Sequence, residues 1–179
     1  MTKIASGKTV PKHVVIIPDG NRRWAKVHGL TPIAGHKKGL ETALKVVRGS
    51  RNLGVRILTL WGFSTENWRR PPVEVGYLMR IYTHFFRKHL EELVVEGVKF
   101  NWLGRRDRVP KVLRAILEKI EKETAKNSRY ILNICIDYGG REELVGVVKK
   151  ILKRGVRPSQ VTEEMISENL ATSGLPDPD

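Results

Sequence analysis

Short apolar segments alternate along this chain with longer amphipathic ones, and this alternation limits the possible folds more than any other feature. His13–Ile17 and Val55–Trp61 are short, apolar and rich in β-branched residues, as buried strands are. We expect two further strands over Val98–Leu103 and Tyr130–Ile136. Strands separated by helical segments are typical of an α/β fold with a largely parallel central sheet flanked by helices.

Between these strands, apolar residues recur every three or four positions, which is the spacing of one face of a helix. The chain has no repeat, low-complexity run or linker, so we expect one domain over residues 1–179. The spacing predicts helices over His36–Leu53, Val73–Glu96, Pro110–Ala125, Arg141–Lys153 and Thr162–Leu170.

Apolar run length and cysteine content exclude several classes of protein. The apolar runs are far shorter than the roughly 18 residues that a membrane span requires, and no signal-peptide pattern opens the chain. The single cysteine, Cys135, cannot build an internal disulfide framework or a zinc cage. We therefore expect a soluble, cytoplasmic protein.

The chain is strongly basic, with 33 Lys and Arg against 19 Asp and Glu and a formal net charge of +14. The last basic residue is Arg157, and only acidic charges follow it. Such an excess is typical of proteins that bind nucleic acid, a membrane surface or a phosphorylated small substrate. The solvated surface of a thermally robust protein has the same composition, so charge alone leaves all four interpretations open.

The first predicted strand is followed by the sequence DGNRRW, residues 19–24. In open parallel sheets, ligands bind beyond the carboxyl ends of the strands. A glycine and an asparagine that lead into a helix present free backbone N–H groups, and two arginines add forked donors for phosphate oxygens. A carboxylate in that setting, Asp19, suits a Mg²⁺ ion that bridges to the phosphates. The alternative is that Asp19 caps the helix and the arginines are solvated.

Polar and aromatic side chains also follow the second and fourth predicted strands. The second strand leads into residues 62–72, GFSTENWRRPP, where Asn67 can orient a proton or a diphosphate and Trp68 offers a large apolar face. The fourth leads into residues 137–142, DYGGRE, whose glycines either permit close backbone approach or form a plain turn.

The remaining candidates have ordinary structural interpretations. His36 opens a predicted helix, and a lone histidine there is more often structural than catalytic. The Met and aromatic stripe over residues 78–86 is typical of plain core. The sequence contains no Walker A lysine motif, GxGxxG, Ser-His-Asp spacing, HExxH or CxxC, so nucleotide sites of those two kinds and the common hydrolase and zinc classes have no support.

Four ordered segments resemble the cis-prenyltransferases, the family of undecaprenyl diphosphate synthase and dehydrodolichyl diphosphate synthase. They are HVVIIPDGNRRWA (13–25), GH (35–36), FSTENWRRPPVEV (63–75) and NICIDYGGREEL (133–144). The resemblance implies condensation of isopentenyl diphosphate with an allylic diphosphate, such as farnesyl or geranylgeranyl diphosphate. The products would be a cis-polyprenyl diphosphate lipid carrier and pyrophosphate. The resemblance also implies a need for Mg²⁺ and a homodimer when the chain is full length.

The same resemblance assigns roles by motif. Asp19 is implied as the essential catalytic carboxylate and the Mg²⁺ ligand, and Asn67 as the residue that positions or deprotonates the isopentenyl unit. The growing chain needs an apolar tunnel, and one side of the helix from Val73 is expected to wall it. The substrates would be bound by Gly20, Asn21, Arg22, Arg23, Trp24, His36, Ser64, Thr65, Glu66, Trp68 and Arg70.

The sequence departs from the family pattern in four places. Pro18, Pro32 and Asp137 stand where members often carry Met, Arg and Asn. After PDPD (176–179) the family continues with a further strand, an arginine and serine signature and an acidic metal ligand, whereas this sequence ends at Asp179. We therefore expect a domain that lacks its last strand and is incomplete at the C-terminus.

Two explanations of that ending stay open. The chain is either part of a longer enzyme or, as the alternative function, a half-catalytic or inactive subunit of a heteromeric prenyltransferase. No strand motif or recognition helix supports nucleic-acid binding. The basic residues outside the motifs are expected to lie on the surface or to contact anionic lipid, so that the protein sits peripherally at the membrane.

Overall fold

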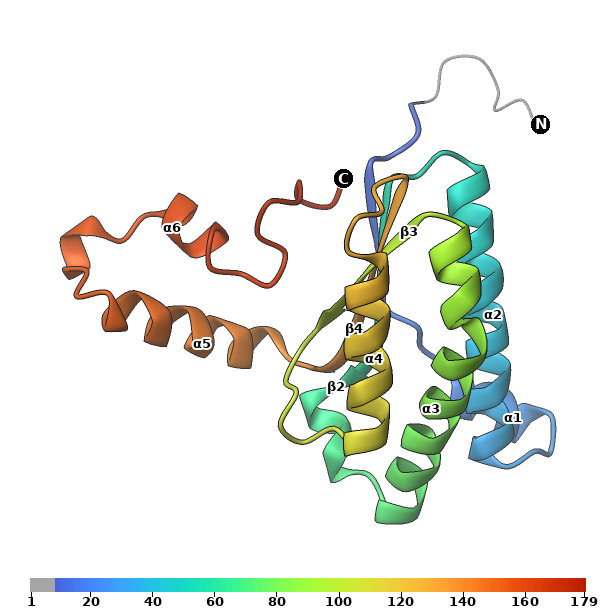
Figure 1. The fold of residues 1–179 in the computed structure, drawn as a ribbon. Helices are drawn as coiled ribbons and strands as arrows, with labels where there is room; N and C mark the ends of the chain where they lie inside the picture. The colour runs from blue at the N-terminus through green and yellow to red at the C-terminus, as the bar shows by residue number, and fades with distance from the viewer. Residues whose placement is uncertain (1–8) are drawn as a thin grey trace.

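The computed structural model describes residues 9–179, and its centre is a four-stranded sheet in which every strand is parallel to its neighbours (Figure 1). The order across the sheet is β1-β2-β4-β3. This confirms the predicted α/β fold. The strands are β1 (His13–Ile16), β2 (Ile57–Ser64), β3 (Val98–Leu103) and β4 (Tyr130–Tyr138).

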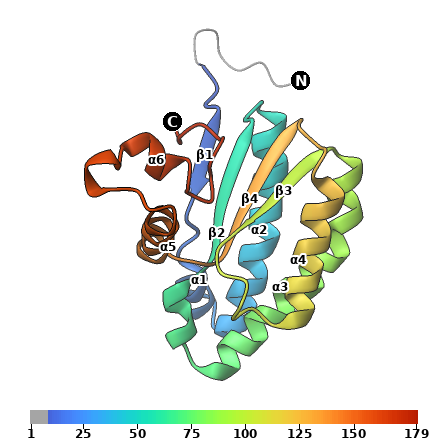
Figure 2. The same ribbon diagram turned by 60° about the vertical axis from the view of Figure 1, so that its left-hand side comes forward.

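Helices connect each strand to the next. α2, α3 and α4 cover one face of the sheet, whereas α5 extends away from the body of the molecule and the residues after it turn back, so that the C-terminus lies beside β1 (Figures 1 and 2). None of the helices in residues 9–179 is both long and apolar enough to cross a membrane. The helical elements are α1 (Asn21–Val27), α2 (Pro32–Asn52), the 3₁₀ turn η1 (Thr65–Arg69), α3 (Pro72–Val95), α4 (Lys111–Thr124), α5 (Gly140–Lys153), the 3₁₀ turn η2 (Pro158–Gln160) and α6 (Glu163–Ser167).

The start of α2 differs most from the prediction, which placed it four residues later at His36. Thr31 caps the helix, since its Oγ1 accepts a hydrogen bond from the Ala34 N–H at 3.4 Å. Proline is favoured at the first helical position, where Pro32 stands. The Thr-Pro pair is therefore a start signal that periodicity alone does not reveal.

Two strands and the last helix end two or three residues away from their predicted ends. β2 continues to Ser64 and β4 to Tyr138, because the two strands remain paired through irregularities in register after Trp61. α6 ends at Ser167 rather than Leu170. Thr162 caps α6 as predicted.

The core lies between the sheet and the three covering helices. Alternate residues of β2 and β4 point toward the helices, and α4 adds a fully buried stripe spaced by three and four. Burial of each large apolar side chain contributes about 1.5–3 kcal/mol. The core includes Leu58, Leu60, Leu132, Ile134, Leu78, Tyr82, Phe86, Leu113, Leu117 and Ile120.

A row of polar side chains crosses all four strands. His13 Nε2 lies 2.8 Å from Thr59 Oγ1, and Asn133 Nδ2 donates to the same hydroxyl at 2.9 Å. Asn101 Nδ2 donates to Asn133 Oδ1 at 2.8 Å. A one-residue slip of any strand would leave these groups unpaired, so the row fixes the register.

The end of the chain returns to the edge strand β1. The backbone N–H groups of Lys12 and His13 donate to the Asp179 carboxylate at 2.6 and 2.9 Å, and the Asp179 N–H donates to the His13 carbonyl at 3.1 Å. These backbone donors, His13 first, hold the pKa of the Asp179 carboxyl below its usual value. That the domain over residues 1–179 is incomplete stays a prediction.

Two glycines allow α1 to lie directly against α2. A Cβ atom on Gly35 would lie 2.1 Å from the backbone oxygen of Asn21, and one on Gly39 would lie 2.5 Å from Asn21 Nδ2. Only hydrogen fits in these positions. The contact therefore sets where Asn21 and the two arginines after it lie relative to α2.

We expect Gly35→Ala to lower the free energy of unfolding by about 1–3 kcal/mol, because the new methyl group meets backbone atoms. Gly49 lies in the same helix with open space around it, so Gly49→Ala should raise that free energy by roughly 0.5–1 kcal/mol through helix propensity. Urea unfolding followed by circular dichroism measures both. Equal effects of the two substitutions would contradict this packing.

Candidate active site

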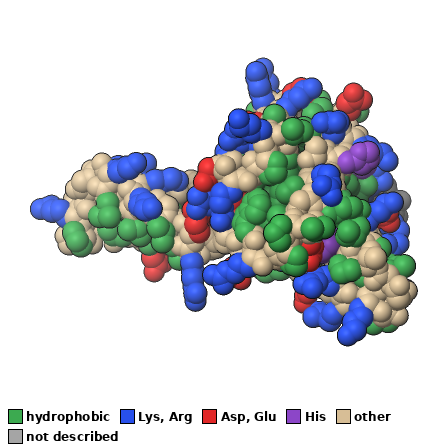
Figure 3. All heavy atoms as spheres, turned by 90° about the horizontal axis from the view of Figure 1, so that it is seen from below, with side chains coloured by type: hydrophobic (Ala, Val, Ile, Leu, Met, Phe, Trp, Pro, Cys, Tyr) green, Lys and Arg blue, Asp and Glu red, His purple; other side chains and the backbone are tan. Residues whose placement is uncertain are grey.

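A cavity of about 780 Å³ lies between α2, α3 and the sheet, within the size range of small-molecule sites. Its polar end is at the beginnings of α2 and α3, and its apolar part runs along both helices. Seen from below, Lys and Arg side chains surround a patch of hydrophobic side chains (Figure 3). The apolar walls include Leu40, Leu44 and Val47 of α2, Leu78, Tyr82, Phe85, Phe86 and Leu93 of α3, and Leu60, Leu132 and Ile134 of the sheet.

Most of the residues that the sequence singled out do line this cavity. They come from the β1–α1 turn, the second turn of α2 and the segment after β2, which are far apart in the chain. Trp24, Thr65, Glu66 and Trp68 do not line it. The nine lining residues are Asp19, Gly20, Asn21, Arg22, Arg23, His36, Ser64, Asn67 and Arg70.

Asp19 lies at the exposed mouth of the cavity. Its carboxylate accepts hydrogen bonds from the Gly20 N–H at 2.5 Å and from Arg23 Nη2 at 2.8 Å. The Arg23 guanidinium, with help from the Gly20 N–H, holds the pKa of this carboxyl below its usual value. Both side chains of the pair are more than three-quarters exposed (77% and 78%), so an incoming ion can displace the contact at little cost.

The alternative that Asp19 caps α1 fails. The residue that precedes α1 is Gly20, and its φ of 92° is one that glycine adopts readily. α1 has no side-chain cap. The Asp19 carboxylate bonds to the turn and to Arg23 instead, and remains open to solvent.

His36 is buried, and its Nε2 lies 3.1 Å from Glu74 Oε1. The same carboxylate oxygen accepts from Arg70 Nη1 at 3.4 Å. Burial is the main cause that lowers the pKa of His36; the Glu74 carboxylate acts in the opposite direction, and the positive charges of Arg70 and Arg22 lower the pKa further, so the net shift is downward. His36 is therefore a neutral ring at neutral pH that donates to Glu74 and supports Arg70 at the cavity mouth.

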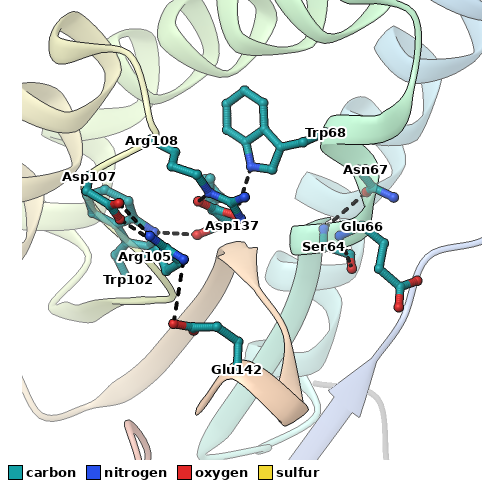
Figure 4. A network of polar contacts seen from close by, with 11 residues as sticks. Ser64, Glu66, Asn67, Trp68, Trp102, Arg105, Asp107, Arg108, Asp137 and Glu142 are labelled. Atoms are coloured by element: carbon teal, nitrogen blue, oxygen red, sulfur yellow. Dashed lines mark hydrogen bonds and ion pairs between the residues drawn. The ribbon is translucent and has the colours of Figure 1, made fainter. Parts of the chain in front are cut away.

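Asn67 has a fixed orientation. The Ser64 N–H donates to Asn67 Oδ1 at 3.1 Å, and the Glu66 N–H donates to Ser64 Oγ at 3.1 Å (Figure 4). Because a backbone N–H can only donate, the atom of Asn67 that receives it is the oxygen. The NH₂ group of Asn67 is left to donate to a bound ligand.

The other predicted residues have structural contacts. Trp24 stacks on His28 with ring centroids 4.3 Å apart. Thr65 packs so closely against the turn after β4 that a Cβ on Gly139 would lie 2.4 Å from its hydroxyl oxygen. Glu66 is exposed. Trp68 lines a second groove, beside α3 and the start of α4, and its indole N–H donates to Asp137 at 2.8 Å.

Three residues in or near the cavity make polar contacts that the sequence did not predict. Glu74 is four residues after Arg70, a spacing that signals a helical ion pair. Tyr82 donates its hydroxyl to the Gly62 carbonyl at 2.8 Å, and burial raises its pKa to about 12. Arg108 pairs with a residue 29 positions later, so no local pattern reveals it.

The family model described as "Putative undecaprenyl diphosphate synthase" matches residues 17–179. The chain belongs to this prenyltransferase family. Isoprenyl transferases of Bacillus thuringiensis subsp. konkukian and Geobacillus kaustophilus are 43% and 45% identical to it over 174 residues. These matches include 95% of this chain and 67% and 68% of the relatives, so the chain spans about two thirds of their length. The resemblance and the enzyme class expected from the sequence are confirmed.

Solved structures agree with this assignment. Lavandulyl diphosphate synthase from Lavandula x intermedia, determined in complex with dimethylallyl diphosphate, has a TM-score of 0.89 and 33% identity. The match covers 95% of this chain and 75% of that one. A "probable undecaprenyl diphosphate synthase" from Campylobacter jejuni has a TM-score of 0.74 and 24% identity over 92% of this chain and 70% of that one, which supports the fold alone.

The side chains at the cavity mouth suit Mg²⁺ only when a bound phosphate group supplies further oxygen ligands to the ion. Residues 9–179 contain no group of three or more His, Cys, Asp or Glu that could hold a metal. Asp19 is the one carboxylate among the described residues that line the cavity. Mg²⁺ in phosphate sites is commonly held by one or two carboxylates, water and the phosphates themselves. An ionised, exposed Asp19 beside arginines suits that arrangement.

We expect stability to fall in mild acid because of His36. Its pKa in the folded protein is lowered, so the unfolded chain binds the proton more readily. The contribution is fully present above a pH of about 6.5 and is lost as the pH falls through and below that value. Thermal unfolding between pH 7.5 and 5 should show this loss, and His36→Gln should reduce it.

His28→Gln is the matched control, because His28 is an exposed histidine on α1's C-terminal side. Its profile should follow that of the unsubstituted protein. A profile of His36→Gln that also follows it would contradict the assignment to His36.

Proposed function

We propose that this chain is a cis-prenyltransferase that condenses isopentenyl diphosphate with an allylic diphosphate such as farnesyl or geranylgeranyl diphosphate. Its products would be a cis-polyprenyl diphosphate and pyrophosphate. The observation that carries the proposal is one cavity with two unlike parts, a basic mouth and an apolar interior. A diphosphate with a hydrocarbon tail has the same division. Membership of the family supports the class of reaction.

In this proposal the mouth binds the diphosphates. Arg22, Arg23 and Arg70 offer forked donors, and Gly20, Asn21 and Ser64 line the wall between them. Departure of pyrophosphate builds negative charge, which fixed cations and donors stabilise. His36, neutral and bonded to Glu74, would hold Arg70 in place and assist that departure.

Asn67 would bind and orient isopentenyl diphosphate through its NH₂ group, because its oxygen already receives the Ser64 N–H. Asp19 would hold Mg²⁺ together with diphosphate oxygens. The ion would supply positive charge against the leaving pyrophosphate. Trp24, Thr65, Glu66 and Trp68 would act from outside the cavity wall, by holding the segments that carry the lining residues.

The hydrocarbon chain would lie in the interior between α2 and α3. Each buried methylene contributes about 0.8 kcal/mol, so a growing chain is drawn along the apolar walls. Beyond them the two helices are joined by ion pairs, Arg48 with Glu92 at 2.5 Å and Arg51 with Glu96. His89, which lines the cavity, also bonds Glu92 at 2.8 Å.

The same proposal includes the location and the oligomeric state of the enzyme. We expect a cytoplasmic homodimer whose basic surface contacts anionic lipid peripherally, where the apolar product must be delivered. The net charge of +14 supports attraction to an anionic surface.

The test is incorporation of labelled isopentenyl diphosphate into butanol-extractable product with farnesyl diphosphate and Mg²⁺. We expect product from the unsubstituted protein and a loss of kcat/KM on the order of 100- to 1000-fold in Arg22→Ala, because one donor to the leaving group is gone. Arg87→Ala, on the exposed side of α3, is the matched control and should be fully active.

No product from the unsubstituted protein would sink the proposal. So would an Arg22→Ala variant as active as the control. Product that forms only after a second protein is added would favour the alternative, a half-catalytic subunit of a heteromeric prenyltransferase.

Removal of Mg²⁺ should abolish incorporation, because arginines alone would face the charge of two diphosphates. Asp19→Asn should raise the Mg²⁺ concentration needed for half-maximal rate and lower the maximal rate on the order of 100-fold. Rates measured across a Mg²⁺ titration, after treatment with EDTA, provide both values. An unchanged rate in EDTA would exclude the metal from the reaction.

A further inference from the structure

Asp137, near the end of β4, is a fully buried carboxylate in a backbone conformation that is uncommon for any residue but glycine. Its exposed fraction is 0% and its φ is 56°. Buried carboxylates need partners that satisfy their charge and their lone pairs. An unusual backbone conformation persists where the surrounding structure requires it.

Asp137 has two side-chain partners from different parts of the chain. Trp68 Nε1 donates to its Oδ1 at 2.8 Å, and Arg108 Nε donates to its Oδ2 at 2.9 Å (Figure 4). Arg108 Nη2 also donates to Oδ1. The Arg108 guanidinium lies 5.6 Å from the centroid of the Trp68 ring, so the three groups form one contact set.

The backbone reinforces this contact set. The Asp137 carbonyl accepts the Arg105 N–H at 3.0 Å. A Cβ on Gly104 would lie 2.3 Å from the Ile136 carbonyl oxygen, so the loop after β3 lies directly against the end of β4. The segments that follow β2 and β3 are thus joined to the end of β4 at one residue, Asp137.

This junction is separated from the ligand cavity by one turn of chain. Trp68 does not line the cavity, but Asn67 just before it and Arg70 just after it do. All three belong to the 3₁₀ turn η1 and its cap. The contacts of Trp68 with Asp137 and Arg108, on the side away from the cavity, therefore keep Asn67 and Arg70 facing the cavity.

We propose that Asp137 is a positioning residue for the transferase reaction: its buried carboxylate anchors Trp68 and Arg108 and so sets how Asn67 and Arg70 face the isopentenyl diphosphate. This role rests on the proposed function. In this proposal Trp68 fixes the position of η1 through its hydrogen bond to Asp137, and it does not contact the hydrocarbon substrate. Arg108 neutralises the carboxylate and closes the junction from the side of the loop after β3.

Two substitutions separate the charge from the hydrogen bond. Asp137→Asn keeps an oxygen that can accept the Trp68 N–H but removes the charge that pairs with Arg108. Asp137→Ala removes both. The matched control is Glu121→Gln, since Glu121 also accepts from arginine and from a backbone N–H beside β3 but does not touch η1.

In kinetics we expect Asp137→Ala to lower kcat/KM on the order of 100-fold, the scale of a displaced reacting group. The KM for isopentenyl diphosphate should rise, whereas the KM for farnesyl diphosphate, whose proposed ligands Arg22 and Arg23 lie on α1, should change little. Asp137→Asn should recover most of the activity, and Glu121→Gln should match the unsubstituted enzyme. A general loss of folding would shift both KM values or neither.

Two measurements test the proposed role of Asp137 without enzyme turnover. The four tryptophans give four indole N–H signals in a ¹⁵N-labelled protein, and the signal of Trp68 is identified by its loss in Trp68→Phe. It should move in Asp137→Ala and stay near its place in Asp137→Asn, with Trp24 as the reference. Binding of isopentenyl diphosphate with Mg²⁺ and without an allylic diphosphate, measured by calorimetry, should weaken about tenfold in Asp137→Ala.

Several results would overturn the proposal. One is a Trp68 signal that does not move in Asp137→Ala. The others are equal changes of both KM values in that variant, and an Asp137→Asn variant that is no more active than Asp137→Ala. If the unsubstituted chain made no product, the proposed function would fail by itself. The Trp68 signal would still decide whether Asp137 positions the segment.

Discussion

Parallel hydrogen bonding of β2 to β1 on one side and β4 on the other determines where every functional side chain lies. Because the strands run in the same direction, the segments after β1, β2 and β4 leave the sheet at one edge. The ends of these strands and the segments after them carry Asp19–Arg23, Ser64–Arg70 and Asp137. The buried polar row through Thr59 and Asn133 fixes the register of this pairing, and hence the height of each segment at the edge.

The helices above the sheet divide the cavity into its two parts. α2 begins at the same edge and α3 begins just after Arg70, so the second turn of α2 brings His36 to the mouth beside Arg70, whereas most of the later lining residues of both helices are apolar. Burial keeps His36 neutral, so the positive charge at the mouth comes from arginines, which stay charged at any physiological pH. The result is a lasting preference for anions at one end of an apolar space.

Sequence periodicity predicted the strands, their parallel sheet and most helices, because these depend on local spacing of apolar residues. Motif resemblance predicted nine residues that line the cavity, since all of them except His36 lie at or just after the ends of β1 and β2. The orientation of Trp68 was beyond such reasoning. Its partner Asp137 is 69 positions away, and a long-range hydrogen bond leaves no local pattern. The Thr31-Pro32 pair signals the start of α2, but the spacing of apolar residues, on which the prediction was based, does not include these two residues.

The central claim is that one cavity binds the diphosphate at its basic mouth and the hydrocarbon between α2 and α3. A crystal structure of this chain with farnesyl diphosphate tests it most directly. The account predicts diphosphate oxygens within hydrogen-bond distance of Arg22 and Arg23, and a tail along Leu44 and Phe85. A ligand whose tail lay on the outer surface, or whose diphosphate lay in the groove beside Arg80 and Arg87, would contradict it.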